Sequence, residues 1–224
     1  MEHALLGLAC LYAGVPYAPI FPSYSTFSTD HARLRHIINL LTPGLVFAAY
    51  GTRFAGAIEA VVPPDAEVVV TENPQRGRET TLFAALTETS ESAAVDATHA
   101  VVGLDTIAKF LFTSGSTGLP KGVINTQRVL TSNQVMLNTV LAFLKGEPLV
   151  IVDWLPWNHT FGGNHNVGLV LFNGGTALYR RRQADARRHR GNSPQPARDL
   201  APRSISTCRR ATRRWCRTWR RSRI

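Results

Sequence analysis

Apolar residues recur at helical spacing twice within the first 41 residues. The stretch 2–13 carries four leucines and stops before Gly14, so we predict a helix there that is buried in the core. A loop rich in Pro, Tyr and Ser follows over 16–28. A second helix is predicted over 30–41, because apolar residues line one of its faces: Leu34, Ile37, Ile38 and Leu41.

Beyond residue 41, short apolar runs alternate with helical patterns, and glycine or proline often separates them. The short runs predict strands at 45–49, 67–71, 107–112, 121–125 and 150–155. The helical patterns predict helices at 54–62, 127–143 and 163–172. Such alternation is typical of a parallel sheet with helices on both faces. We therefore predict an α/β fold with a mainly parallel sheet flanked by helices.

Charge divides the chain into two very different parts. The whole sequence has 25 basic and 15 acidic side chains, a net charge of +10. Residues 1–179 hold 9 basic and 13 acidic side chains, a net of −4, whereas residues 180–224 hold 16 arginines, no lysine and 2 aspartates, a net of +14. The second part has too few large apolar residues to offset the entropy of ordering it. We predict a folded domain over 2–179 and a disordered Arg-rich tail over 180–224.

Cysteine and the N-terminal residues indicate the compartment. The three cysteines, Cys10, Cys208 and Cys216, form no CxxC pair, which argues against a disulfide framework or a zinc site. The apolar run 4–13 follows Glu2 and His3 rather than lysine or arginine, and ten residues are too few to cross a bilayer. We therefore expect a reducing, cytoplasmic location and no role in a membrane.

The segment TSGSTGLPKGV at 113–123 has the composition of a phosphate cradle. Glycines admit backbone N–H groups to an anion and relieve restrictions on φ, hydroxyls donate hydrogen bonds, and a lysine supplies a point charge. The candidate binding residues are Thr113, Ser114, Gly115, Ser116, Thr117, Gly118 and Lys121. Because Gly122 follows the lysine, this is not the GxxxxGK[ST] nucleotide loop, and no GxSxG hydrolase elbow is formed. From composition alone, a solvent-exposed turn is the alternative.

A second segment, WLPWNHTFGG at 154–163, combines aromatic residues with His159. The residues alone favour a hydrogen-bonded structural histidine at His159 and core residues at Trp154 and Trp157. His165 lies six positions after His159, which gives no metal-ligand spacing, and we expect no metal site.

Both segments resemble motifs of the adenylate-forming superfamily, which includes acyl-CoA synthetases, peptide-synthetase adenylation domains and luciferases. The first is similar to the phosphate-binding signature and the second to LPxxHxxG, the motif that lines the acyl pocket. The resemblance implies that residues 113–121 handle phosphate and that His159, Phe161 and Gly162 border the acid. We assign no catalytic residue. The wider sequence is most similar to feruloyl-CoA synthetases.

The resemblance also implies a reaction and its substrates. In this family a carboxylate attacks the α-phosphate of Mg-ATP, pyrophosphate leaves, and the thiol of coenzyme A then displaces AMP. The implied substrates and cofactors are a hydroxycinnamic acid, ATP, Mg²⁺ and coenzyme A. The family's later segments, including its C-terminal domain, have no counterpart in these 224 residues, so we expect a partial N-terminal domain that is inactive alone.

The tail has two competing explanations. When permitted codons for residues 180–201 are read one base forward, the product resembles the continuation of feruloyl-CoA synthetases, and a second change of frame near 202–204 restores further similarity. The hypothesis is therefore an out-of-frame tail. The alternative is a basic arm that binds nucleic acid, with arginines on phosphates and with Trp215 and Trp219 stacked on bases.

Overall fold

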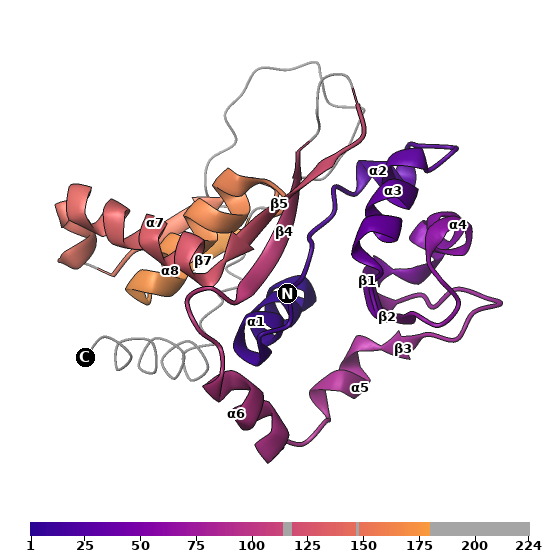
Figure 1. The fold of residues 1–224 in the computed structure, drawn as a ribbon, viewed down its shortest axis with the longest axis horizontal. Coiled ribbons are helices and arrows are strands. Elements are labelled where there is room, and N and C mark those ends of the chain that lie inside the picture. The colour runs from indigo at the N-terminus through magenta and orange to yellow at the C-terminus, as the bar shows by residue number, and fades with distance from the viewer. Residues whose placement is uncertain (114–117, 147, 180–224) are drawn as a thin grey trace. The chain divides into compact units, whose positions relative to one another are not determined.

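The computed structural model describes residues 1–113, 118–146 and 148–179 (Figure 1). Residues Met1–Arg128 form one compact unit, and the described residues from Val129 onward form a second. Residues 180–224, for which the sequence predicts a disordered tail, lie outside the described residues, so that prediction stays a prediction.

The first unit contains a three-stranded sheet of order β1-β2-β3, in which each pair of neighbouring strands is parallel, and a separate antiparallel pair, β4-β5. Its strands are β1 (Leu45–Tyr50), β2 (Glu67–Glu72), β3 (Thr81–Leu82), β4 (Ile107–Thr113) and β5 (Lys121–Thr126). Its helices are α1 (Glu2–Ala13), α2 (Ser23–Thr26), α3 (Ala32–Leu41), α4 (Gly51–Val61), α5 (Phe83–Thr87) and α6 (Ala93–Ala100).

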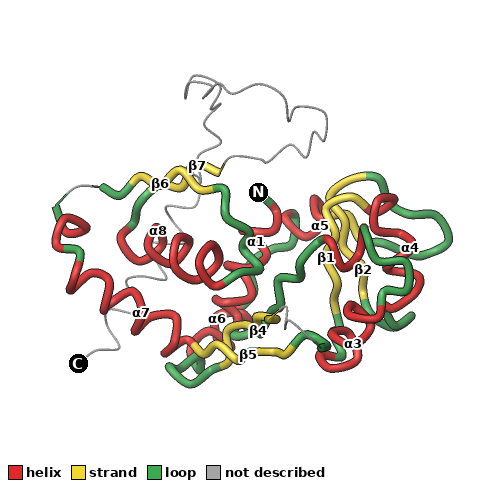
Figure 2. The backbone as a smooth tube through the Cα atoms, turned by 90° about the horizontal axis from the view of Figure 1, so that it is seen from above, coloured by secondary structure: helices red, strands yellow, loops and turns green. Residues whose placement is uncertain are grey.

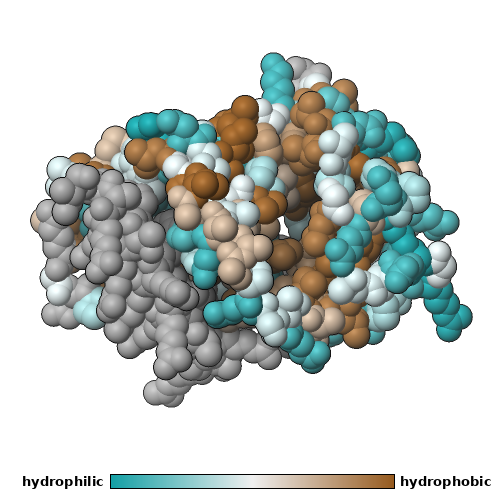
Figure 3. Space-filling model, turned by 60° about the horizontal axis from the view of Figure 1, so that its bottom comes forward, coloured by the Kyte–Doolittle hydropathy of each residue, from teal (hydrophilic) through white to brown (hydrophobic). Residues whose placement is uncertain are grey.

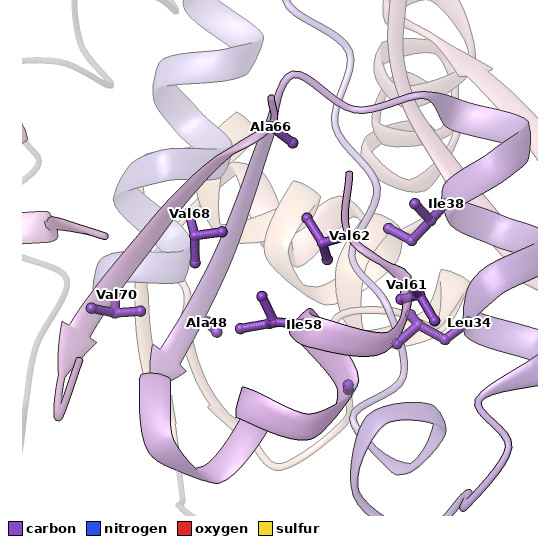
Figure 4. Close-up of a cluster of buried hydrophobic side chains, with 10 residues drawn as sticks. Leu34, Ile38, Ala48, Ile58, Val61, Val62, Ala66, Val68 and Val70 are labelled. Carbon is purple, nitrogen blue, oxygen red and sulfur yellow. The ribbon is translucent and has the colours of Figure 1, made fainter. Parts of the chain in front are cut away.

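Helices cover both faces of the sheet at β2, where Val68, Val69 and Val70 are buried, whereas in β1 only Ala48 is buried. Alternate residues point to opposite faces of a sheet. Those on one face pack with α3 and α4 in a single buried cluster, most of which is labelled in Figure 4: Leu34, Ile38, Ala48, Ala57, Ile58, Val61, Val62, Ala66, Val68 and Val70. On the other face, Phe47 contacts Phe83 of α5, with ring centroids 6.0 Å apart. The predicted parallel sheet flanked by helices is confirmed here.

Strands β4 and β5 form a hairpin that the sequence predicts as two strands without predicting how they pair. They are antiparallel, with Phe110 opposite Ile124 and Thr113 opposite Lys121. Their apolar side chains are only partly covered, since Val123 is 47% and Ile124 57% exposed. Other large apolar side chains also reach the surface. On the face in Figure 3, hydrophobic residues (brown) lie among hydrophilic ones (teal).

The second unit is built around a parallel pair of strands and two stretches of helix. Helix α7 (Gln127–Val140) begins at the end of the first unit. It is followed by a 3-10 helix (Ala142–Lys145), β6 (Val150–Asp153), a π-helix (Phe161–Asn166), α8 (Val167–Asn173) and β7 (Thr176–Tyr179). Figure 2 shows β6 and β7 side by side, with Val150 opposite Thr176.

Several details differ from the sequence predictions. Helix α1 is not buried, because only Gly7 and Leu11 are buried in it and Leu5 is 39% exposed. The helix predicted over 127–143 stops at Val140 and gives way to a 3-10 turn. The helix predicted over 163–172 begins earlier, as a π-helix. Strands β3 and β7 and the short helices α2, α5 and α6 are not predicted, since their segments are too short to show a period.

Candidate active site

The hairpin β4-β5 places both ends of the phosphate-cradle segment next to each other. Thr113 ends β4, Lys121 begins β5, and the two residues are direct partners across the strands. The hydroxyl of Thr113 donates to the carbonyl of Lys121 at 3.5 Å. Both residues are exposed, so the hydroxyl and the ammonium are accessible at the mouth of the loop. Ser114, Gly115, Ser116 and Thr117 lie outside the described residues.

Gly118 is the first described residue after the undescribed part of the loop. A Cβ at Gly118 would meet no described atom within 4 Å. The residue is exposed, and what the missing side chain provides is open access to its backbone.

A buried lysine that the sequence analysis missed lies on the strand that leads into the loop. Lys109 is only 2% exposed, and burial lowers its pKa to about 8. Its ammonium lies 5.7 Å from the ring centroid of Tyr17, an attractive cation–π arrangement. Burial, followed by the charge of Cys10, raises the pKa of Tyr17 to about 12. The available signal was a charged residue within the apolar run IAKFLF.

The second candidate segment joins β6 to the π-helix in the second unit. His159 is exposed, and its Nδ1 accepts the backbone N–H of Phe161 at 3.3 Å. The carbonyl of His159 accepts the N–H of Gly163 at 2.8 Å, which ties the histidine to the first turn of the π-helix. The ring of Phe161 is 53% exposed and stacks on His165 with centroids 4.8 Å apart. An exposed imidazole therefore lies in a turn next to an exposed aromatic surface.

Gly162 is glycine because the backbone approaches it too closely for a side chain. A Cβ at Gly162 would lie 2.6 Å from the carbonyl oxygen of Pro156 and 3.0 Å from Cβ of Leu155. Gly162 is also buried. The π-helix thus packs directly on the backbone of the preceding loop, and π-helical turns often occur at functional sites.

The carboxylate of Asp153 is a second residue that the sequence analysis missed. It is 4% exposed, and its Oδ1 accepts the backbone N–H of Leu155 and the side-chain amide of Asn166, both at 3.0 Å. A buried carboxylate with two donors is well satisfied. Asp153 therefore holds together the two ends of the segment that carries His159.

A small cavity of about 30 Å³ lies beside this carboxylate. Its walls are Ile151, Asp153, Trp157, Asn166, Val167, Val170, Leu171, Ala177 and Tyr179. This volume accommodates about two water molecules. The cavity is therefore too small to be the pocket for an aromatic acid.

The site residues are divided between the two units. Thr113, Gly118 and Lys121 belong to the first unit, and His159, Phe161 and Gly162 belong to the second. Among the described residues, no three His, Cys, Asp or Glu side chains gather as they would around a metal ion. No helix in the described part of the chain is long and apolar enough to cross a membrane.

Known proteins resemble this chain over most of its length. Of solved structures, ATP-bound MatB from Rhodopseudomonas palustris is 24% identical, with a TM-score of 0.56, and the match covers 80% of this chain and 33% of that one. A malonyl-CoA ligase complex with methylmalonyl-CoA and AMP is 27% identical, with a TM-score of 0.55 and coverages of 80% and 32%. This chain therefore spans about a third of the length of these solved relatives.

A curated relative and a family profile agree with this likeness. A medium-chain-fatty-acid–[acyl-carrier-protein] ligase, TtuA, from Teredinibacter turnerae is 40% identical over 70 residues, which are 31% of this chain and 11% of that protein. The profile described as AMP-binding enzyme matches residues 1–192, well over half of the chain. The chain therefore belongs to the AMP-binding enzyme family, within the adenylate-forming superfamily.

Proposed function

We propose that this chain is the phosphate-binding part of an AMP-forming carboxylate–CoA ligase. The observation that carries the proposal is the pairing of Thr113 with Lys121 at the mouth of the loop, in a chain of the AMP-binding family. Solved relatives contain ATP in one case and AMP with methylmalonyl-CoA in another, which supports ATP and coenzyme A as substrates.

In this proposal the loop binds the β- and γ-phosphates of ATP. The carboxylate of the acid attacks the α-phosphorus, a new P–O bond forms, and the bond to pyrophosphate breaks. The ammonium of Lys121 and the hydroxyl of Thr113 then face the negative charge that collects on the leaving pyrophosphate. The sulfur of coenzyme A, once deprotonated, next attacks the acyl carbon and releases AMP. Lys121 and Thr113 thus act by charge and hydrogen bonding, and Ser114 to Thr117 complete the cradle.

Magnesium enters the proposal through ATP rather than through a cage of protein ligands. Mg²⁺ at nucleotides is usually held by phosphate oxygens and one or two carboxylates. The described residues contain no cluster of three candidate ligands. We therefore assign no residue of this chain to the metal.

We infer that the acid is aromatic, of the hydroxycinnamic class. The inference depends on the likeness of the sequence to feruloyl-CoA synthetases and on the exposed aromatic surface next to His159. Phe161 is 53% exposed and stacks on His165. Flat aromatic faces suit a planar aromatic substrate. His159, Phe161 and Gly162 are the proposed neighbours of its carboxylate end.

We propose further that residues 180–224 are encoded out of frame and that these 224 residues alone do not complete the reaction. Sixteen arginines without a lysine support a shifted reading of GC-rich DNA. Sequencing the coding DNA around codons 177–180 and 202–204 tests the frame. Release of AMP together with feruloyl-CoA by the purified chain would contradict the proposed inactivity.

The cytoplasmic location remains part of the same proposal. Cys10 is a free thiol in the described part of the chain, which suits a reducing compartment. The alternative of a nucleic-acid-binding arm lies wholly within residues 180–224, outside the described residues, and no observation favours it.

Calorimetric titration of the whole chain with Mg-ATP and with pyrophosphate tests the phosphate site. We expect Lys121→Ala to weaken binding of both by about tenfold or more, because a charge-assisted contact is lost. Arg53→Ala is the matched control, since Arg53 is an exposed cation on α4 and its loss removes the same formal charge. The unsubstituted chain and both variants keep the Arg-rich tail. Nonspecific binding of anions to the tail therefore contributes equally to all three titrations. Equal losses in the two variants would contradict the proposal.

A further inference from the structure

Helix α3 contacts the phosphate loop on both sides of Lys121. His36 lies on this helix, and its Nε2 is 3.1 Å from the carbonyl oxygen of Pro120, the residue before Lys121. A carbonyl oxygen only accepts, so Nε2 must carry the proton of this hydrogen bond. Leu40, one helical turn further on, lies 3.8 Å from the Cβ position of Gly122, the residue after Lys121. These two contacts bracket the lysine.

The two contacts come from one face of a well-anchored helix. Residues four apart in a helix lie on the same side. Leu34 and Ile38 are buried on the opposite side, where α3 packs on the core of the parallel sheet (Figure 4). Helix α3 therefore lies between the core of the parallel sheet and residues 120–122, at the C-terminal end of the phosphate loop.

The loop side of this contact is equally restricted. Pro120 is among the most completely buried residues and its ring fixes φ. Gly122 is paired with Phe112 across the hairpin, and a Cβ at Gly122 would lie 3.3 Å from the Phe112 ring, which would have to shift slightly to admit it. The backbone on both sides of Lys121 is thus held, while Lys121 itself is exposed.

We propose that His36 is a positioning residue for the phosphate site: its hydrogen bond to Pro120 fixes the backbone from which Lys121 reaches the phosphates. This inference rests on the proposed function. His36 touches no reacting atom in this account. The hydrogen bond of His36 restricts the backbone next to Lys121 before the anion binds. Binding then loses less conformational entropy in ordering Lys121.

The test compares His36→Ala and His36→Gln in the whole chain. Glutamine retains an N–H donor at the end of its side chain, whereas alanine removes it. We expect His36→Ala to weaken pyrophosphate binding about tenfold, in line with one hydrogen bond, and His36→Gln to recover most of the affinity. Asn39→Ala, an exposed position on the same helix, is the control and should leave the dissociation constant unchanged.

A double-mutant cycle separates positioning from a general loss of stability. If His36 acts through Lys121, His36→Ala should change pyrophosphate affinity by less than about twofold when Lys121→Ala is already present. Equal losses in both backgrounds, or an unchanged affinity in His36→Ala, would overturn the inference and leave the proposed function standing. Absence of pyrophosphate binding by the unsubstituted chain would instead overturn the proposed function, and the inference with it.

The unliganded chain supplies a second readout that does not depend on binding. We expect the amide resonances of Lys121 and Gly122 to shift in His36→Ala and to return in His36→Gln, with those of Arg53 unaffected. Unaltered Lys121 and Gly122 resonances in His36→Ala would show that the hydrogen bond does not hold this backbone, and would also overturn the inference.

Discussion

Asp153 accepts a hydrogen bond from the side-chain amide of Asn166 at 3.0 Å. Asp153 ends β6 and Asn166 ends the π-helix, so this single contact joins the two ends of the segment that carries His159. The same carboxylate oxygen accepts the N–H of Leu155. The conformation of the candidate acid-binding segment therefore depends on a residue outside the motif itself.

Replacing this carboxylate should destabilise the second unit. Asp153→Ala leaves the N–H of Leu155 and the amide of Asn166 without their acceptor, which costs about 1–3 kcal/mol of unfolding free energy. Urea unfolding followed by circular dichroism measures the change. Asp105→Ala is the control, because Asp105 forms an exposed ion pair with Arg128, and its loss should have little effect. Equal unfolding midpoints for the two variants would contradict this role of Asp153.

Gly162→Ala should be costly, whereas the same substitution on α4 should be favourable. The new Cβ at Gly162 would lie 2.6 Å from the carbonyl oxygen of Pro156, so the loop or the π-helix must move, at a cost of about 1–3 kcal/mol. Gly56 lies inside α4 with no atom within 4 Å of a Cβ, so Gly56→Ala should stabilise by about 0.5–1 kcal/mol. Thermal unfolding of the two variants measures whether each substitution lowers or raises stability. A stabilised Gly162→Ala would contradict the close approach of the Pro156 carbonyl to Gly162.

Lys109 should make the stability of the first unit depend on pH in alkaline solution. Burial lowers its pKa from 10.5 to about 8, so between these values the unfolded chain binds more protons than the native chain at this residue. Below about pH 8 the buried Lys109 is charged, and the cost of burying that charge lowers the unfolding free energy by its full amount. Toward pH 10.5 this cost disappears, so the unfolding free energy rises with pH across this window.

Comparison with Lys109→Met isolates this effect. Burial raises the pKa values of Cys10 and Tyr17, which act in the opposite direction above about pH 9, so the useful range ends there. We expect the unfolding free energy of Lys109→Met relative to the unsubstituted chain to fall by about 1 kcal/mol between about pH 7.5 and 9. Urea titrations at several pH values measure it, and a constant difference would be inconsistent with a charged, buried Lys109.

Strand β2 and helix α3 of the parallel-sheet layer were predictable because their apolar residues are buried in the core, whereas the two-residue strand β3 was not predicted. Val68, Val69 and Val70 form a continuous β-branched run, and Leu34 and Ile38 repeat at helical spacing. The local pattern and the final packing agree there. The π-helix was not predictable, because its first turn depends on the contact of Gly162 with Pro156, which hydrophobic periodicity does not encode.

The candidate site was predictable only where a motif is contiguous in sequence. Thr113 and Lys121 are found from the loop composition, and the structure pairs them. His36 lies 84 residues before Pro120, so nothing local to either residue indicates their hydrogen bond. Lys109 was overlooked because a strand that contains one charged residue is normally expected to direct it to solvent, whereas here it is buried.

The most direct test of the central claim is a pyrophosphate titration of the isotopically labelled chain, followed by amide resonances. We expect the largest shifts in the loop from Thr113 to Gly122, with Arg53 on α4 unaffected and with the loop shifts lost in Lys121→Ala. Shifts confined to the arginines of residues 180–224, with Thr113, Gly118 and Lys121 unchanged, would contradict a phosphate site in the loop.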